Sequence, residues 1–200
     1  MIRRSLARLY WRLSRWALVS EPQPPATTAR VIIGTPHTSN WDGVLMVAIA
    51  WTYDIELHWL GKKQLFAPPL GLLTRALGGI PVDRANPGRL VEEIVAGQSE
   101  RPFSIVVTPE GTRRGGGGWK SGFYRIAREA DLPVTLGYVD RDTMTCGLGP
   151  TIELTGDVGA DMDVIRAFYA DKSGLRPANR SEPRLAQEPR GGDDRPVEPA

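Results

Sequence analysis

Short runs of apolar, often β-branched residues alternate with helical segments along most of the chain. Val31-Ile32-Ile33 is the clearest of these runs, and its composition favours a buried strand. A polar loop follows it, and a helical segment comes next, at residues 43–51. Strands that alternate with helices form parallel sheets covered by helices. The sequence therefore predicts a single α/β domain with a mostly parallel central sheet flanked by helices.

The same alternation continues to about residue 170. Further strands are expected at residues 55–60, 80–82, 103–107, 133–139 and 151–155. Further helices are expected at residues 87–97, 121–130 and 160–170, and in part of 65–77. Pro68-Pro69 interrupts the last of these segments, because proline cannot continue a helix.

The first 20 residues form a basic segment with five arginines and no acidic residue. Ile2, Leu6, Leu9 and Leu13 recur at helical spacing, which predicts an amphipathic helix over residues 2–19. An apolar stripe bordered by arginines suits the surface of an anionic bilayer. The alternative is a first helix that packs on the protein's own core. No run of 18 or more apolar residues occurs, so no transmembrane helix is expected.

From Asp171 onward the helical and strand patterns are lost, and five prolines are spread among charged and small residues. Such a composition buries too little apolar surface to offset the entropy of ordering the chain. The sequence thus predicts three parts: an amphipathic membrane-surface helix at 1–20, a folded domain at 21–170 and a disordered tail at 171–200.

A histidine and an aspartate follow the first predicted strand. His37 and Asp42 are five residues apart in the loop that precedes the helical segment at 43–51. The carboxyl ends of the strands are where α/β sheets bind ligands. A carboxylate on one imidazole nitrogen fixes the tautomer and leaves the other nitrogen as a base that can take a proton from an alcohol. A histidine that merely caps a helix is the structural alternative.

A second polar segment, Glu110-Gly111-Thr112-Arg113, follows the strand expected at 103–107. Glycine allows a sharp turn there, and the planar guanidinium of arginine suits a phosphate. An ordinary turn with a surface ion pair is the alternative. A third segment, Gly79 to Arg84, places another arginine after a short extended piece, and the fourth, Leu132-Pro133-Val134, is apolar.

Composition excludes several other classes of protein. The single cysteine, Cys146, excludes an internal disulfide and a zinc site of several thiolates. A net charge of only +2 argues against a strongly basic nucleic-acid binder. No G-x-S-x-G segment occurs, which argues against a serine esterase. The second histidine, His58, falls within a predicted strand and is expected to be structural.

In their order along the chain, the four segments resemble the conserved blocks of the glycerolipid acyltransferase family, which includes lysophosphatidic acid acyltransferases. His37 and Asp42 match its H-x4-D block, and Glu110 to Arg113 match its E-G-T-R block. The third and fourth segments match the remaining two blocks, and Lys62 and Lys63 lie in a further match at residues 61–66. The resemblance covers roughly residues 30–140.

The resemblance implies an O-acyltransferase that moves a fatty acyl chain from acyl-CoA or acyl-carrier protein to the hydroxyl of a lysophospholipid, such as 1-acyl-sn-glycerol 3-phosphate, in phospholipid biosynthesis. It implies no metal or other cofactor. His37 would be the general base and Asp42 its orienting partner. The acceptor site would include Arg84, Glu110, Gly111, Thr112, Arg113, Lys62 and Lys63.

For a protein of this kind we expect a lipid acceptor and a membrane surface as partners, and no nucleic acid. We expect it in the cytoplasm, bound peripherally to the inner face of the cell membrane. The sequence leaves three alternatives open. They are an acyltransferase for a different lipid acceptor, a thioester or lipid hydrolase that uses the same His-Asp pair, and an inactive membrane-bound scaffold.

Overall fold

The computed structural model describes residues 2–82, 103–114 and 118–185, together with residues 92, 96 and 188. Within these residues a seven-stranded sheet has the order β1-β7-β6-β2-β5-β3-β4. Its strands are β1 (Ala17–Leu18), β2 (Arg30–Thr35), β3 (Leu57–Lys62), β4 (Gly79–Val82), β5 (Ser104–Val107), β6 (Val134–Asp140) and β7 (Thr145–Ile152).

Most of the sheet is parallel. The central strand β2 pairs in parallel with both β5 and β6, and β3 pairs in parallel with β5 and β4. β7 is antiparallel to β6, and the short β1 runs parallel to β7. The strands β2 to β6 therefore point the same way, and their carboxyl ends share one edge. The α/β fold with a mostly parallel sheet that the sequence predicts is confirmed.

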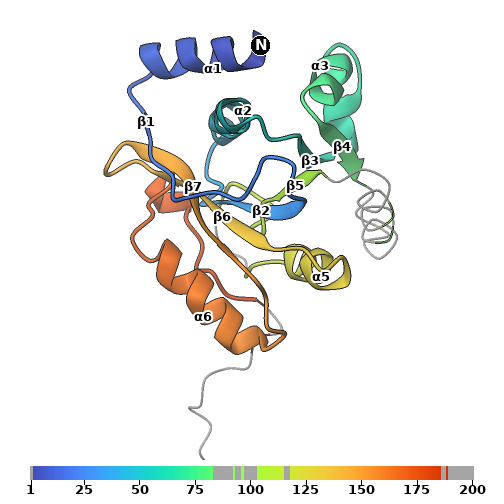
Figure 1. Ribbon diagram of the computed structural model, residues 1–200, viewed down its shortest axis with the longest axis vertical. Helices are drawn as coiled ribbons and strands as arrows, with labels where there is room; N and C mark the ends of the chain where they lie inside the picture. The colour runs from blue at the N-terminus through green and yellow to red at the C-terminus, as the bar shows by residue number, and fades with distance from the viewer. Residues whose placement is uncertain are drawn as a thin grey trace, which may run out of the picture.

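Helices cover both faces of this sheet, as Figure 1 shows. α2 (Asp42–Tyr53) lies on one face with α1 (Ile2–Leu13) beyond it, while α5 (Gly122–Glu129) and α6 (Val158–Tyr169) lie on the opposite face. The short helix α3 (Gly71–Ala76) lies near β3 and β4 (Figure 1). The described residues also contain two single turns of 3₁₀ helix, η1 (Lys63–Phe66) and η2 (Pro177–Asn179).

Successive side chains of β2 point in turn to the helices on one face of the sheet and to those on the other. Ile32 packs in a buried cluster with Leu45 of α2, whereas Val31 and Ile33 pack in a second cluster with Phe123 of α5. A strand that is covered on both faces is apolar along its whole length. This explains why β2 is a continuous run of β-branched residues in the sequence.

The N-terminal helix is shorter than predicted. The sequence predicts a helix over residues 2–19, but α1 ends at Leu13 and β1 follows. The backbone N–H groups of Ala17 and Val19 donate to the carbonyls of Met144 and Cys146. The prediction was wrong beyond Leu13 because pairing with a strand far away in the sequence replaces the last turns of the helix.

The last strand begins earlier than predicted. The sequence predicts a strand at residues 151–155, whereas β7 starts at Thr145 and ends at Ile152. A tight turn at residues 141–144 reverses the chain and makes β7 antiparallel to β6. Glycine and proline in this strand hide its pattern, because both residues are uncommon inside strands.

The segment at 171–185 is ordered, contrary to the prediction of a disordered tail from Asp171 onward. Ser173 donates from its hydroxyl to Oδ1 of Asp140 at 2.8 Å, and Gly174 donates from its backbone to Val139. Leu185 is buried beside Trp119, whose N–H donates to the carbonyl of Arg184. The segment gains its order from contacts with the domain, which its own composition does not reveal.

The remaining elements agree with the predictions to within a few residues. The helix predicted at 87–97 lies almost wholly outside the described residues, and so does the end of the chain after residue 188. Among the described residues, no helix is long and apolar enough to span a bilayer.

Truncation tests the role of the ordered segment. Deleting residues 171–200 is expected to lower the free energy of unfolding by about 3–5 kcal/mol, since it exposes a leucine pocket and removes the hydrogen bonds that Ser173 donates to the buried Asp140. Deleting only residues 189–200 is the matched control and should change the free energy by less than about 0.5 kcal/mol. Urea denaturation measures both, and equal stability of the two truncated proteins would contradict the prediction.

Candidate active site

The candidate site lies at the edge where the parallel strands end. β2 ends at Thr35 and β5 at Val107, and the two strands are paired through Ile33 and Val107. The loop after β2 carries His37, and the loop after β5 carries Glu110. Parallel pairing thus brings together two polar segments that are 73 positions apart in the chain.

His37 and Asp42 are in direct contact. Nδ1 of His37 lies 3.1 Å from Oδ2 of Asp42, and the same oxygen accepts the backbone N–H groups of Thr38 and Ser39 at 2.8 Å each. Asp42 is the first residue of α2, so the loop turns straight into a helix and the carboxylate folds back onto the ring. A negative charge at a helix N-terminus is also favoured by the helix dipole.

This contact selects one form of the imidazole. A carboxylate beside Nδ1 favours the tautomer with a proton on Nδ1, which leaves Nε2 as the basic nitrogen. The side chain of His37 is 21% exposed and that of Asp42 10%. The ring is therefore held by Asp42 at its Nδ1 side, while part of the ring is exposed to solvent.

Glu110 lies beneath this loop. Its Oε1 accepts the hydroxyl of Thr35 and the backbone N–H of His37, the latter at 3.0 Å. The residue is only 6% exposed, and burial raises the pKa of the carboxyl although these hydrogen bonds oppose the shift. The contact with His37 fixes the start of the loop after β2 to the loop that follows β5.

The rest of the E-G-T-R segment turns toward solvent. Gly111 has a φ of +63°, a conformation that favours glycine, and a Cβ there would lie 3.1 Å from Cε of Lys120. Thr112 and Arg113 are exposed. This segment therefore presents one arginine, and a lysine close to its glycine, beside the loop that carries His37.

The two lysines of the sequence analysis lie farther along the same edge. Lys62 ends β3 and Lys63 begins η1, and both are exposed. β5 separates β3 from β2, so these lysines are two strands away from the strand of His37. Arg84, the other predicted site residue, lies outside the described residues.

At this edge of the sheet a carboxylate contacts an imidazole, and Arg113, Lys62 and Lys63 are exposed in the segments that follow β5 and end β3. A family model described as Acyltransferase matches residues 18–136, which is more than half of the chain. The chain belongs to the Acyltransferase family. The family that the sequence blocks resemble is thereby confirmed.

One named acyltransferase is similar to part of this chain. The 1-acyl-sn-glycerol-3-phosphate acyltransferase of Limnanthes alba is 31% identical to this chain over 115 residues, which make up 54% of this chain and 40% of the relative. The match therefore spans well under half the length of this curated relative.

A solved structure has the same fold. The crystal structure of the 1-acyl-sn-glycerophosphate (LPA) acyltransferase PlsC from Thermotoga maritima matches with a TM-score of 0.54. Sequence identity is 17%, and the match covers 78% of this chain and 69% of that chain. At this identity the likeness concerns the arrangement of strands and helices.

The segment after α6 contacts the H-x4-D loop of this family member. The backbone N–H of Arg176 donates to Oγ1 of Thr38 at 3.0 Å. Gly174 has a φ of +71°, and a Cβ there would lie 2.9 Å from Cβ of Pro36 and 3.1 Å from the side chain of Thr38. The sequence does not predict these contacts, because nothing in the composition of residues 171–176 indicates them.

Other chemically active groups lie elsewhere. Cys146 is fully buried, and burial raises the pKa of its thiol to about 12, so it is no nucleophile near neutral pH. His58 lies in β3 and stacks edge-on against Phe103. Among the described residues, no three His, Cys, Asp or Glu side chains gather in a way that could hold a metal ion.

Two glycines with positive φ provide a test of the loop support. Gly174→Ala is expected to displace Pro36 and Thr38, and so to shift the NMR signals of the His37 ring while those of His58 stay in place. Gly156→Ala is the matched control, because Gly156 also has a positive φ, of +98°, but its Cβ would meet only the guanidinium of Arg128. With two histidines in the chain, ¹H–¹³C spectra resolve both rings. Unchanged His37 signals in Gly174→Ala would contradict the contact.

Proposed function

We propose that this protein transfers an acyl chain from an acyl thioester, carried by coenzyme A or by acyl-carrier protein, to the free hydroxyl of 1-acyl-sn-glycerol 3-phosphate. The observation that carries the proposal is the Asp42–His37 contact, in which a carboxylate held by two backbone N–H groups orients an imidazole at the ligand-binding edge of the sheet. Membership of the Acyltransferase family and the named relative support the reaction class.

In the proposed reaction, Nε2 of His37 takes the proton of the acceptor hydroxyl as its oxygen attacks the thioester carbonyl. A bond forms between that oxygen and the acyl carbon, and the carbon–sulfur bond then breaks. The imidazolium returns its proton to the departing thiolate, so that an ester and a free thiol are the products. Asp42 stabilises the imidazolium between the two transfers through the contact of its carboxylate with Nδ1.

The cations at this edge suit the phosphate of the acceptor. Arg113 offers a planar donor pair for two phosphate oxygens. Lys62 and Lys63, exposed at the end of β3, add positive charge on the same side of the sheet. Glu110 is buried below the loop, and we assign it the role of holding His37 rather than of contacting the acceptor.

A membrane surface is the proposed location of the reaction. α1 has two faces: Ala7 is buried and Trp11 donates to Thr52 of α2 at 2.8 Å, whereas Leu6 and Leu9 on the other side remain about half exposed. That exposed stripe consists of Ile2, Leu6, Leu9 and Leu13, spaced as one face of a helix. The helix therefore packs on the domain and also presents an unpaired apolar face.

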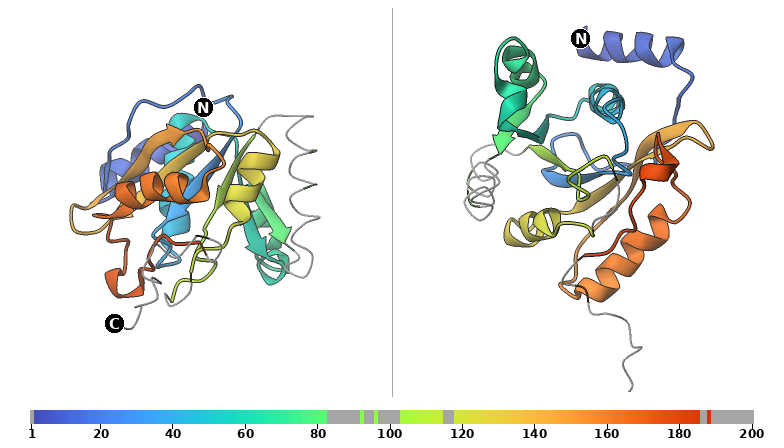
Figure 2. Two further views of the ribbon diagram at one scale, coloured as in Figure 1. Left: turned by 90° about the horizontal axis from the view of Figure 1, so that it is seen from below. Right: turned by 180° about the vertical axis from the view of Figure 1, so that it is seen from behind.

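A second apolar surface lies on the same side of the molecule. Leu65, Leu70, Leu72 and Leu73, in and around η1 and α3, are exposed, Leu72 at 85%. Figure 1 and the right view of Figure 2 place α1 and α3 at the same end of the domain. Arginines border the leucines of α1, an arrangement that favours an anionic bilayer over a protein partner.

Substitution of the general base tests the reaction. His37→Ala is expected to lower the rate of acyl transfer by about 10²–10⁴-fold, because proton removal from the hydroxyl then falls to water. His58→Gln is the control and should keep most of the activity. Purified protein, acyl-CoA and lysophosphatidate suffice, and release of free thiol is followed with and without acceptor. Near-normal transfer by folded His37→Ala protein would refute the mechanism, while thiol release that needs no acceptor would identify a hydrolase.

Two exposed aliphatic residues, one on α1 and one on α6, test whether the leucine stripe of α1 binds the membrane. Leu9→Glu, on α1, removes an apolar contact and adds a charge that an anionic bilayer repels, so binding to anionic vesicles should weaken about tenfold or more. Val164→Glu, on α6, is the matched control, because the two side chains are 54% and 53% exposed. Vesicle co-sedimentation compares the two variants. Equal loss, or no loss, would place the membrane contact on another surface.

A further inference from the structure

Arg30, the first residue of β2, is a buried arginine with an incomplete set of partners. It is only 1% exposed. One guanidinium nitrogen donates to Oε1 of Gln23 at 3.1 Å, and Nε is buried without a hydrogen-bond partner in the part of the chain that the structure describes. An amide oxygen carries only a partial charge and cannot balance a full positive charge.

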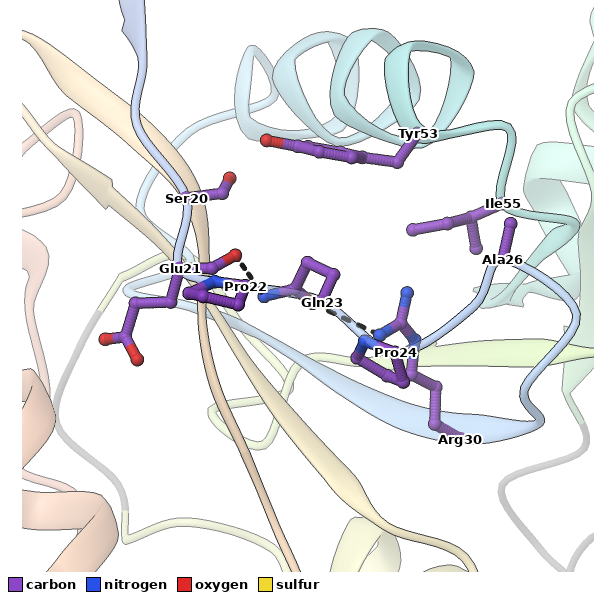
Figure 3. A pocket seen from close by; sticks show the side chains of 9 residues that line it. All are labelled: Ser20, Glu21, Pro22, Gln23, Pro24, Ala26, Arg30, Tyr53 and Ile55. Atoms are coloured by element: carbon purple, nitrogen blue, oxygen red, sulfur yellow. Dashed lines mark hydrogen bonds between the residues drawn. The ribbon is translucent and has the colours of Figure 1, made fainter.

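Within the described part of the chain, no carboxylate offsets this charge. Burial lowers the pKa of the Arg30 guanidinium, and no acidic group acts against that shift; the group nevertheless stays charged at any physiological pH. Asp54, at the end of α2, pairs with Arg4 at 3.2 Å. Glu21 points its carboxylate away from Arg30 in Figure 3. A buried charge without a counter-ion is strongly unfavourable, so a ligand that supplies one is favoured.

A second unpaired group lies beside Arg30. Ser104 of β5 is its register partner, and residues that pair across neighbouring parallel strands point to the same face. The Oγ atom of Ser104 is buried and also lacks a hydrogen-bond partner among the described residues. Two adjacent strands thus place a guanidinium N–H and a hydroxyl, both unpaired, on the face that α2 covers.

Of these two residues, Arg30 lines a preformed cavity of about 530 Å³. Figure 3 shows the Arg30 guanidinium on one side of it and the hydroxyls of Ser20 and Tyr53 on another. Ser20 already accepts the N–H of Leu148 at 2.9 Å, which leaves its own proton free to donate. The cavity therefore presents donors from more than one direction.

The walls of the cavity are fixed before any ligand binds. Pro22 and Pro24 line it, and proline has a fixed φ. Gln23 between them donates to the carbonyl of Gly149 at 2.9 Å, which holds its oxygen toward Arg30. None of the exposed large hydrophobic side chains lines the cavity, so it is not part of the exposed leucine surfaces of α1 and α3.

We propose that this cavity is a binding site for the phosphate group of a small water-soluble molecule, with Arg30 as the anchoring cation. A phosphate has oxygens in several directions and can accept from a guanidinium and from hydroxyls together. The volume exceeds that of a bare ion and lies in the range of small-molecule sites, so a phosphate ester fits it better than inorganic phosphate alone.

The site is separate from the proposed active site. β2 carries Arg30 at its first residue and leads to His37 at its other end, and α2 carries Asp42 at its first residue and Tyr53 at its last. Asp42 and Tyr53 are the two ends of this twelve-residue helix and therefore lie about 16 Å apart along its axis. The phosphate site can therefore be tested whether or not the chain transfers acyl groups.

The experiment compares full-length variants in inorganic phosphate and in chloride at equal ionic strength. The wild-type melting temperature should rise with phosphate in a saturable way, by roughly 3–6 °C at about ten times Kd. Arg113→Met, which removes the cation proposed for the acceptor, should keep that rise. Arg30→Met should lose it, while its melting temperature in chloride stays equal to or above that of the wild type, because an uncompensated buried charge has been removed.

One further variant and one further binding measurement test the phosphate site independently of the folding of Arg30→Met. Arg30→Lys retains the charge if Arg30→Met fails to fold, and should weaken phosphate binding about tenfold in calorimetry, since lysine has no planar donor pair. Binding to vesicles that contain phosphatidic acid should be the same for Arg30→Met and wild type. A phosphate effect that persists in both Arg30 variants, or that disappears in Arg113→Met, would overturn the proposal. Vesicle binding that depends on Arg30 would also overturn it in favour of a lipid headgroup.

Discussion

Oδ2 of Asp42 accepts from three groups at once: the ring of His37 and the backbone N–H groups of Thr38 and Ser39. This single atom closes the loop between β2 and α2, because it joins the helix start to the two residues that follow the histidine. The carboxylate therefore serves the backbone and the imidazole together. Removing it would open the loop as well as release the ring.

Two distant parts of the chain support the same loop. From below, Glu110 of the β5 loop accepts from His37 and Thr35; from the side, Arg176 donates to Thr38. The pKa of Glu110 is raised by burial, which reflects how completely this support is enclosed. The imidazole of His37 is partly exposed to solvent. Its orientation is fixed because several hydrogen bonds hold the backbone and side chains of the surrounding loop.

The predictions from the sequence succeeded where the determining interactions are local. Val31 to Ile33 form a strand by their own preference, and His37 and Asp42 meet because five residues of loop lead into a helix. The predicted helix over residues 2–19 was too long, because residues 17 and 18 pair with β7, a partner 128 positions away from them in the sequence. The segment 171–185 was predicted to be disordered because its partners, such as Asp140, lie outside it.

The sequence by itself determined most of the alternation of strands and helices, the contact between His37 and Asp42 and the amphipathic character of the first helix, since each depends on residues a few positions apart. Only the tertiary structure decided that Glu110 lies under the loop of His37 and that α1 keeps an exposed leucine stripe while it packs on α2. It also decided that Arg30 is buried without a counter-charge. Burial and hydrogen-bond partners depend on which distant segments pack together, and no local pattern encodes that.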